Sequence, residues 1–122
     1  MNHGDFSIQF EVRESYLYAY ISGTDSYETC LNSWVMIAKK AHELGIPRVL
    51  VHESLIGHIT EGELFNVLQQ VIPMGIGIKV AFFNENLDHA TFFALGELMA
   101  QNRGIDIQIF QSLKDAERWI SD

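Results

Sequence analysis

Two stretches of the sequence are rich in side chains that can bind a metal ion or move a proton. The first contains His52, Glu53, His58 and Glu61, and the second contains Asn84, Glu85, Asp88 and His89. Two histidines with several carboxylates could hold zinc. In the helical zinc motif of metalloproteases, however, the two histidines lie four residues apart on one face, whereas His52 and His58 lie six apart across a turn expected at Gly57. The spacing favours solvated loop residues, so a metal-dependent enzyme at this edge ranks last among the hypotheses.

Nucleophilic and cofactor chemistry have even less support in the sequence. Cys30 shares a helical stripe with Trp34, which predicts a buried small hydrophobic side chain. Ser54 stands in no Gly-x-Ser-x-Gly turn and has no evident base. Gly75 and Gly77 precede a strand and do not form the glycine pattern of a dinucleotide site. The sequence therefore predicts a protein that is not an enzyme and has no cofactor.

The elements that position these residues follow from the spacing of the apolar side chains. Residues 6–13 alternate with a period of two, and residues 16–21 are rich in aromatic and β-branched types, which together predict an antiparallel hairpin. The apolar runs at 48–52 and 76–83 predict strands that are covered on both faces. A last strand is expected over 105–109, where isoleucine alternates with polar residues.

Apolar residues recur at helical spacing in four further segments, three of them between strands and one after the last strand. Each segment has a residue suited to begin a helix, and the first three also have one suited to end it. In chain order these caps and stops are Asp25 and Gly45, Thr60 and Pro73 with Gly75, Asn86 or Asp88 and Gly104, and Ser112. The predicted order of elements is therefore ββαβαβαβα.

This order predicts an α/β domain with a mostly parallel five-stranded sheet, an N-terminal antiparallel hairpin and four helices, because strands that alternate with helices are joined by right-handed crossovers. No linker or repeat interrupts residues 1–122, and this length fits one domain. Open α/β sheets bind ligands at the carboxyl ends of their strands. His52 and Glu53 end one predicted strand, and Asn84 and Asp88 follow the next, so these residues are candidates for a binding site.

The balance of charges excludes some partners. Sixteen acidic residues against eight basic ones give a formal net charge of −8, which repels nucleic-acid phosphates and anionic membrane surfaces. The longest apolar region, residues 64–83, is interrupted by Pro73 and Lys79 and predicts no membrane span. The start of the sequence lacks the basic and apolar regions of a signal peptide, and the single cysteine cannot form an internal disulfide. These features predict a cytoplasmic protein.

The last part of the sequence carries its most characteristic residues. Residues 100–105 read Ala-Gln-Asn-Arg-Gly-Ile, residues 109–110 read Ile-Phe, and residues 115–120 read Asp-Ala-Glu-Arg-Trp-Ile. This ending resembles that of the SpoIIAA-like family, a branch of the STAS-type fold of anti-sigma-factor antagonists. The resemblance implies this fold over nearly the whole chain, and a regulatory domain that acts through protein–protein contacts.

The same resemblance points to the position of a regulatory switch. Phosphorylated antagonists of this fold carry a serine at the start of the helix after the third strand. In this sequence Glu61 stands at that position, and Thr60 replaces the preceding aspartate. Glu61 is either a fixed negative charge or simply a favourable first-turn residue, and the Thr60 hydroxyl is expected to cap the helix. The expected regulatory domain therefore lacks the phosphorylatable serine.

Two further expectations concern binding. The SpoIIAA-like branch is described as similar to CRAL-TRIO-like lipid-binding domains, which implies an alternative function as carrier of a small apolar or lipid-like ligand in a pocket between helices and sheet. Large apolar side chains could line such a pocket or simply fill a core, namely Met36, Phe65, Phe92, Phe93 and Met99. The edge of the hairpin over residues 6–21, with Tyr16, Tyr18 and Tyr20 on one face, predicts self-association as a homodimer.

Overall fold

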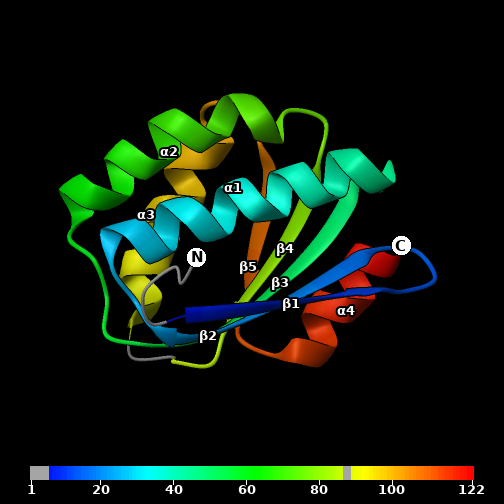
Figure 1. Cartoon of the computed structure of the whole chain (residues 1–122), viewed down its shortest axis with the longest axis horizontal. Coiled ribbons are helices and arrows are strands. Elements are labelled where there is room, and N and C mark those ends of the chain that lie inside the picture. Colours follow the sequence, from blue (N-terminus) through cyan, green and yellow to red (C-terminus); the bar gives the residue numbers. More distant parts are fainter. Residues whose placement is uncertain (1–5, 87–88) are drawn as a thin grey trace.

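The structure, a computed structural model, describes residues 6–86 and 89–122. In these residues the chain forms nine elements in the predicted order ββαβαβαβα (Figure 1). The elements are β1 (Phe6–Val12), β2 (Leu17–Thr24), α1 (Tyr27–Leu44), β3 (Arg48–Ile56), α2 (Glu61–Gly75), β4 (Lys79–Asn84), α3 (Ala90–Gln101), β5 (Asp106–Phe110) and α4 (Leu113–Ser121). No helix among the described residues is long and apolar enough to cross a membrane.

One five-stranded sheet organises the described part of the chain. Its strands lie in the order β1-β2-β3-β4-β5. The β1–β2 pair is antiparallel, and the three other pairs are parallel. The structure therefore confirms the predicted fold class, a mostly parallel sheet that opens with an antiparallel hairpin.

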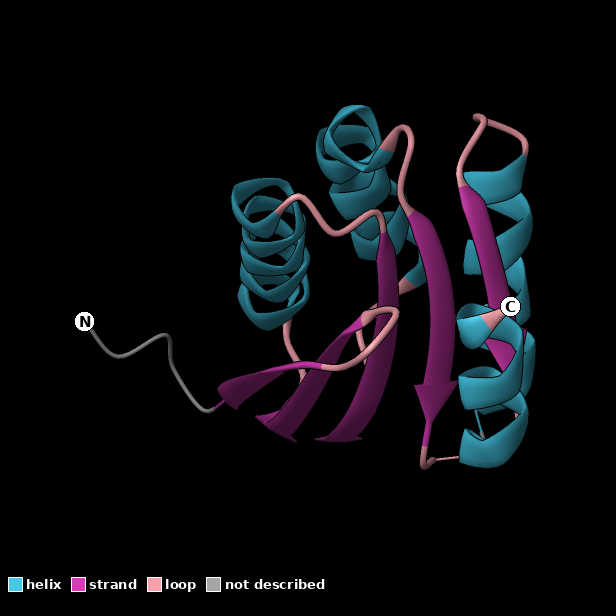
Figure 2. Ribbon diagram, turned by 90° about the vertical axis from the view of Figure 1, so that its right-hand side faces the viewer, coloured by secondary structure: helices cyan, strands magenta, loops and turns pink. Residues whose placement is uncertain are grey.

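The helices form two layers on opposite faces of the sheet. Because each β-α-β crossover is right-handed and moves one strand further along the sheet, α1, α2 and α3 all lie on the same face. Figure 1 shows α1 and α2 above the sheet and α4 below it, and Figure 2 shows the strands between α1 and the C-terminal helix. The core is therefore split into a larger part beneath α1–α3 and a smaller part beneath α4.

The central strand β3 contributes to both parts of the core. Val51 packs with the residues beneath α1–α3, whereas Leu50 packs with Ala116 and Ile120 of α4. Successive side chains of a strand point to opposite faces, so Glu53 lies on the same face as Val51, and His52 on the same face as Leu50. The sequence placed the end of this strand at His52, but β3 continues to Ile56. The two neighbouring candidate residues are thereby separated by the sheet.

Two of the predicted helix starts, Thr60 for α2 and Ser112 for α4, are confirmed, and one, Asp25 for α1, is wrong. Ser26, rather than Asp25, caps α1, since its hydroxyl accepts a hydrogen bond from the Thr29 amide at 3.0 Å. Thr60 caps α2 as predicted. The residue that precedes α3 is His89, which makes no capping side-chain hydrogen bond, so Asn86 is not the cap. The other predicted cap of that helix, Asp88, lies outside the described residues.

The ends of the helices follow the predictions more closely. Gly45 ends α1 in the left-handed conformation with φ of 68°, which favours glycine. Helix α2 ends at Gly75, as predicted, and Pro73 lies within its last turn. The carbonyl oxygen of Met74, in this last turn, lies 2.8 Å from the imidazole Nε2 of His42, so α1 satisfies a group that the end of α2 leaves without a helical partner.

Helix α3 is the least deeply packed of the three helices that cover the larger core. Only Ala100 in α3 is fully buried, whereas α1 buries six residues. Its other contacts come from partly buried aromatic side chains, among them Phe92 and Phe93. Helix α3 therefore covers the sheet with half-buried side chains and without a side-chain cap.

Candidate functional site

An apolar cavity lies between α1, α2, α3 and the sheet. Its volume is about 110 Å³, and all three helices contribute to its wall. The lining side chains are almost all apolar, and they include Trp34, Leu64, Val71, Phe82, Phe92 and Ile107. The pocket between helices and sheet that the sequence suggested as an alternative is therefore present in the structure.

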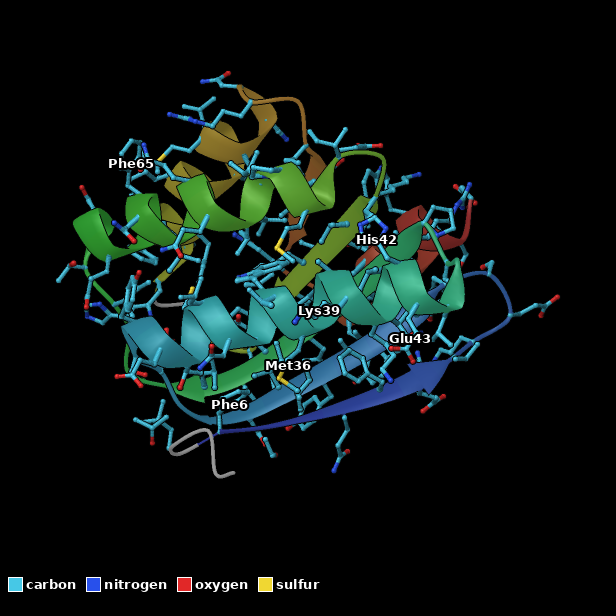
Figure 3. All side chains as sticks on the ribbon, turned by 45° about the horizontal axis from the view of Figure 1, so that its top comes forward. Phe6, Met36, Lys39, His42, Glu43 and Phe65 are labelled. Carbon is cyan, nitrogen blue, oxygen red and sulfur yellow. The ribbon has the colours of Figure 1, made fainter. Side chains whose placement is uncertain are left out.

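The sequence identified the residues of this cavity only in part. Phe92 and Phe93 line it, whereas Phe65, Met36 and Met99 do not. Phe65 follows the lining residue Leu64 by one position, and a step of one residue turns a helix by about 100°. The Phe65 side chain is consequently on the outside of α2 and 40% exposed (Figure 3). Met36 lies on the side of α1 that faces β1 (Figure 3).

Three carboxyl groups line the cavity, those of Glu53 and Asp25 and that of Glu97 on α3. Glu53 pairs in register with Asn84 of the neighbouring strand β4, and the Asn84 amide Nδ2 donates a hydrogen bond to Glu53 Oε1 at 2.9 Å. The Glu53 residue is only 6% exposed. Asp25 follows β2, and its carboxylate accepts a hydrogen bond from the Ser26 amide at 2.9 Å. The polar end of the cavity thus lies near the carboxyl ends of the parallel strands.

Burial raises the pKa of the carboxyl groups of Glu53 and Asp25. Burial, with a smaller contribution from the nearby Asp25 and against the hydrogen bond from Asn84, raises the pKa of Glu53 to about 8. Burial also raises the pKa of Asp25 to about 6, against the hydrogen bond from Ser26 and the nearby charges of His58 and His89. At neutral pH, therefore, Glu53 is mainly a neutral carboxylic acid.

His52 belongs to a separate hydrogen-bonded group on the α4 face. Its Nδ1 lies 2.7 Å from the Tyr18 hydroxyl, and its Nε2 lies 2.7 Å from Glu85 Oε2. The Ser54 hydroxyl donates to Glu85 Oε1 at 3.0 Å and makes no hydrogen bond with His52. Since the serine and the histidine each contact the carboxylate rather than one another, this group does not have the geometry of an activated nucleophile.

The structure does not assemble the metal site considered from the sequence. His58 stacks edge-on against His89, with ring centroids 4.7 Å apart, and lies near Phe92 rather than near His52. Within residues 6–86 and 89–122, no three His, Cys, Asp or Glu side chains are placed to hold a metal ion. Cys30 lines the cavity, and burial raises the pKa of its thiol well above the usual range, which disfavours a thiolate nucleophile.

Thr60 and Glu61 lie at the exposed start of α2. The Thr60 hydroxyl accepts a hydrogen bond from the Glu63 amide at 3.1 Å, and the Glu63 carboxylate accepts one from the Thr60 amide at 2.9 Å. This reciprocal pair is a capping box, so the Thr60 hydroxyl has a structural partner. Glu61 is the first residue of the helix, where a negative charge is favourable.

The candidate residues that the structure describes fall into three places, and the candidate Asp88 lies outside the described residues. Glu53 and Asn84 are brought together beside the cavity, His52 lies on the opposite face, and His58, Thr60 and Glu61 are exposed between β3 and the first turn of α2. Asp25 was missed, because its position before a helix predicted a cap. The neighbouring Ser26 is also a good capping residue. If Ser26 caps the helix, Asp25 is not needed for that purpose, and this is the one signal in the sequence that could have identified Asp25 as a site residue.

Comparisons with known proteins identify the fold. Neither a protein-family model nor a curated protein sequence matches the chain. Among solved structures it is similar to an anti-sigma factor antagonist from Mycobacterium paratuberculosis, with a TM-score of 0.68 and 13% identity over 96% of this chain and 95% of that one. It is also similar to an uncharacterised protein from Shewanella loihica with a SpoIIAA-like fold, with a TM-score of 0.61 and 12% identity over 95% of this chain and 94% of that one. The chain therefore has the SpoIIAA-like, STAS-type fold that its closing segment indicated.

Proposed function

We propose that the chain is a non-enzymatic binding domain that holds a small apolar molecule in the cavity beneath α1, α2 and α3. The cavity and its apolar wall support this function. Protein cores are normally close-packed, and the apolar side chains around this space of about 110 Å³ lack part of the contacts that a packed core would give them. A ligand that fills the space restores the missing contacts.

The volume of the cavity limits the size of this ligand. An engineered apolar cavity of about 150 Å³ in another protein binds benzene. The cavity of this chain, at about 110 Å³, suits a molecule of a single small ring or a short branched chain. The lipid-like ligand that the sequence also suggested exceeds this volume.

Filling the cavity with a larger side chain tests the proposal. Cys30 lines the cavity from α1, and Cys30→Leu adds apolar atoms to it. We expect this variant to be more stable than the wild type by about 1 kcal/mol, because it restores contacts in the void. Benzene should raise the melting temperature of the wild type and leave that of Cys30→Leu unchanged.

The matched control for this experiment lies on the same helix. Met36 is not among the residues that line the cavity, so Met36→Leu should keep the response of the wild type to benzene. A wild type that does not respond to benzene, or a Cys30→Leu variant that responds equally, contradicts the proposed function.

A protein–protein contact is the second candidate function, and the difference between the two edges of the sheet supports it. At the β5 edge, the Glu97 carboxylate accepts a hydrogen bond from the Ile109 amide at 2.7 Å, and the Gln101 side chain donates to the Ile107 carbonyl at 2.8 Å. Side chains of α3 thereby occupy backbone groups that another strand would need. The β5 edge is closed by the protein itself.

At the β1 edge, no side chain of the described residues bonds the outward backbone groups of Ile8, Phe10 and Val12. The β1–β2 hairpin closes with a hydrogen bond from the Arg13 amide to the Tyr16 carbonyl. In an antiparallel pair, hydrogen-bonded and non-hydrogen-bonded residues alternate, so the backbone N–H and C=O groups of Ile8, Phe10 and Val12 point away from β2, toward the open edge. β1 contains one charged residue, Glu11, and neither lysine nor proline, which natural edge strands use to prevent pairing. These features support a homodimer in which two β1 strands pair across a twofold axis.

Like charges on β1 should abolish this dimer. When two β1 strands pair antiparallel about a twofold axis near their middle, residues 9 and 11 lie opposite residues 7, 9 or 11 of the partner strand. The double substitution Gln9→Lys with Glu11→Lys therefore places lysines opposite one another. Sedimentation at tens of micromolar should give twice the chain mass of 13.9 kDa for the wild type and the chain mass for this variant.

The β5 edge supplies the control. Asp106→Lys with Gln108→Lys makes the same change of charge on exposed positions of the other edge strand and should leave the dimer intact. A wild type that sediments at 13.9 kDa would rule out the homodimer.

A further inference from the structure

The Glu53 carboxyl group has one oxygen that the protein uses and one that it does not. Oε1 accepts the hydrogen bond from the Asn84 amide. Oε2 makes no hydrogen bond with any described residue, yet the side chain is 94% removed from solvent and lines the cavity. Every fully buried polar side-chain atom in the described part of the chain has a partner, so this oxygen faces the space of the cavity.

The surroundings of Glu53 contain no compensating positive charge. The other carboxyl groups that line the cavity are Asp25, which follows β2, and Glu97 of α3, and no lysine or arginine lines it. The Glu97 carboxylate is engaged by the Ile109 amide. No basic side chain among residues 6–86 and 89–122 lies within ion-pair distance of Glu53. A buried carboxyl group in such a place keeps its proton.

The position of Asn84 decides which oxygen carries that proton. Because Oε1 already accepts a hydrogen bond, the proton resides on Oε2 and makes it a donor directed into the cavity. A neutral carboxylic acid in an apolar site is a strong hydrogen-bond donor toward a carbonyl oxygen. The cavity therefore combines an apolar wall with one hydrogen-bond donor.

We propose that the molecule held in this cavity is a small uncharged compound with one oxygen acceptor, a ketone or a similar carbonyl compound, which accepts a hydrogen bond from Glu53 Oε2. The inference rests on the proposed binding function and adds the chemistry of the ligand to it. A carboxylate ligand is disfavoured because Asp25 and Glu97 would face it. An amine, which would bring its own positive charge, is the alternative that the experiment separates.

The protonation of Glu53 makes the inference testable by pH. At pH 7 its carboxyl group is mainly protonated, and at pH 9.5 it is ionised. Asp25, with a pKa of about 6, is mainly ionised at both pH values and does not contribute much to the difference. The charges of His58, His89 and Glu63 also act on Asp25, the two histidines lowering its pKa and Glu63 raising it. The hydrogen bond to a ketone should therefore be present at pH 7 and lost at pH 9.5.

The test compares cyclohexanone with methylenecyclohexane, a hydrocarbon of the same shape, by NMR titration of the full chain. The ratio of their affinities removes the contribution of packing and of any change in overall stability. We expect the affinity for cyclohexanone, relative to that for methylenecyclohexane, to fall by about fivefold between pH 7 and pH 9.5. A change of this size corresponds to the loss of one neutral hydrogen bond.

Two variants separate the donor from the shape of the site. Glu53→Gln keeps an oxygen for Asn84 and a donor for the ligand but does not titrate, so its affinity ratio should equal that of the wild type at pH 7 and stay constant with pH. Glu53→Leu has no donor, and its ratio should be about fivefold lower at both pH values.

The outcomes distinguish this inference from the proposed function. If both compounds bind with a ratio that neither pH nor Glu53→Leu changes, the inference is overturned and the cavity remains a binding site. If cyclohexylamine binds more tightly than cyclohexanone and gains affinity as the pH rises, the ligand is a cation and the inference is overturned. If none of these compounds binds, the proposed function itself fails.

Discussion

Replacement of Glu53 by glutamine is expected to stabilise the protein at pH 9 by on the order of 3–5 kcal/mol and to leave it nearly unchanged at pH 5. The native state holds the Glu53 proton up to a pKa of about 8, whereas the unfolded chain releases it near 4.5. Between these values the unfolded state binds fewer protons, so the free energy of unfolding of the wild type falls as the pH rises. The contribution is complete below 4.5 and fully lost above 8.

Urea denaturation at pH 5, 7 and 9 measures this difference. The curves of wild type and Glu53→Gln should separate progressively with pH, while the exposed Glu61→Gln variant should keep the pH dependence of the wild type. The raised pKa of Asp25 also makes the free energy of unfolding fall as the pH rises, but at lower pH, and it does so in both the wild type and Glu53→Gln. Parallel pH profiles for wild type and Glu53→Gln would show that Glu53 is not buried as a neutral acid.

Truncation of Ile120 to alanine is expected to destabilise the protein by about 2–4 kcal/mol. Ile120 has no exposed surface and packs with Leu50 and Ala81 in the smaller part of the core beneath α4. Its removal leaves a void that the neighbouring residues fill only in part. Denaturation by urea at constant pH measures the loss.

The same variant tests whether the two parts of the core are separate. The cavity lies on the opposite face of the sheet, so folded Ile120→Ala should bind benzene with the affinity of the wild type. Ile120→Val, which should lose about 1 kcal/mol, provides the comparison if the alanine variant is too unstable for titration. A weaker affinity in both variants would contradict the separation of the two faces.

The sequence predicted the order of the elements because the signals for them are local. Thr60 and Glu63 identify the start of α2 within four residues, and Gly45 ends α1 through its own backbone conformation. The alternation in β1 needs no information from elsewhere in the chain. Such features follow from the physics of short segments.

The candidate site was harder to predict because it depends on distant partners. Glu53 is charged in isolation, so the apolar run of β3 seemed to end before it. Its burial depends on Asn84, which is 31 residues away in sequence and adjacent only across the sheet. The exposure of Phe65 and the place of Phe92 in the wall of the cavity likewise depend on how α2 and α3 are rotated against the sheet, which their amphipathic patterns define only loosely.

The shallow packing of α3 has a consequence for the kinetics of binding. This helix supplies Phe92 and Phe93 to the wall of the cavity, yet it buries one residue fully and begins at His89 without a side-chain cap. Elements with few buried contacts open locally at a lower free energy than the whole domain. We therefore expect a molecule held in the cavity to exchange by local movement of α3 while the sheet stays folded.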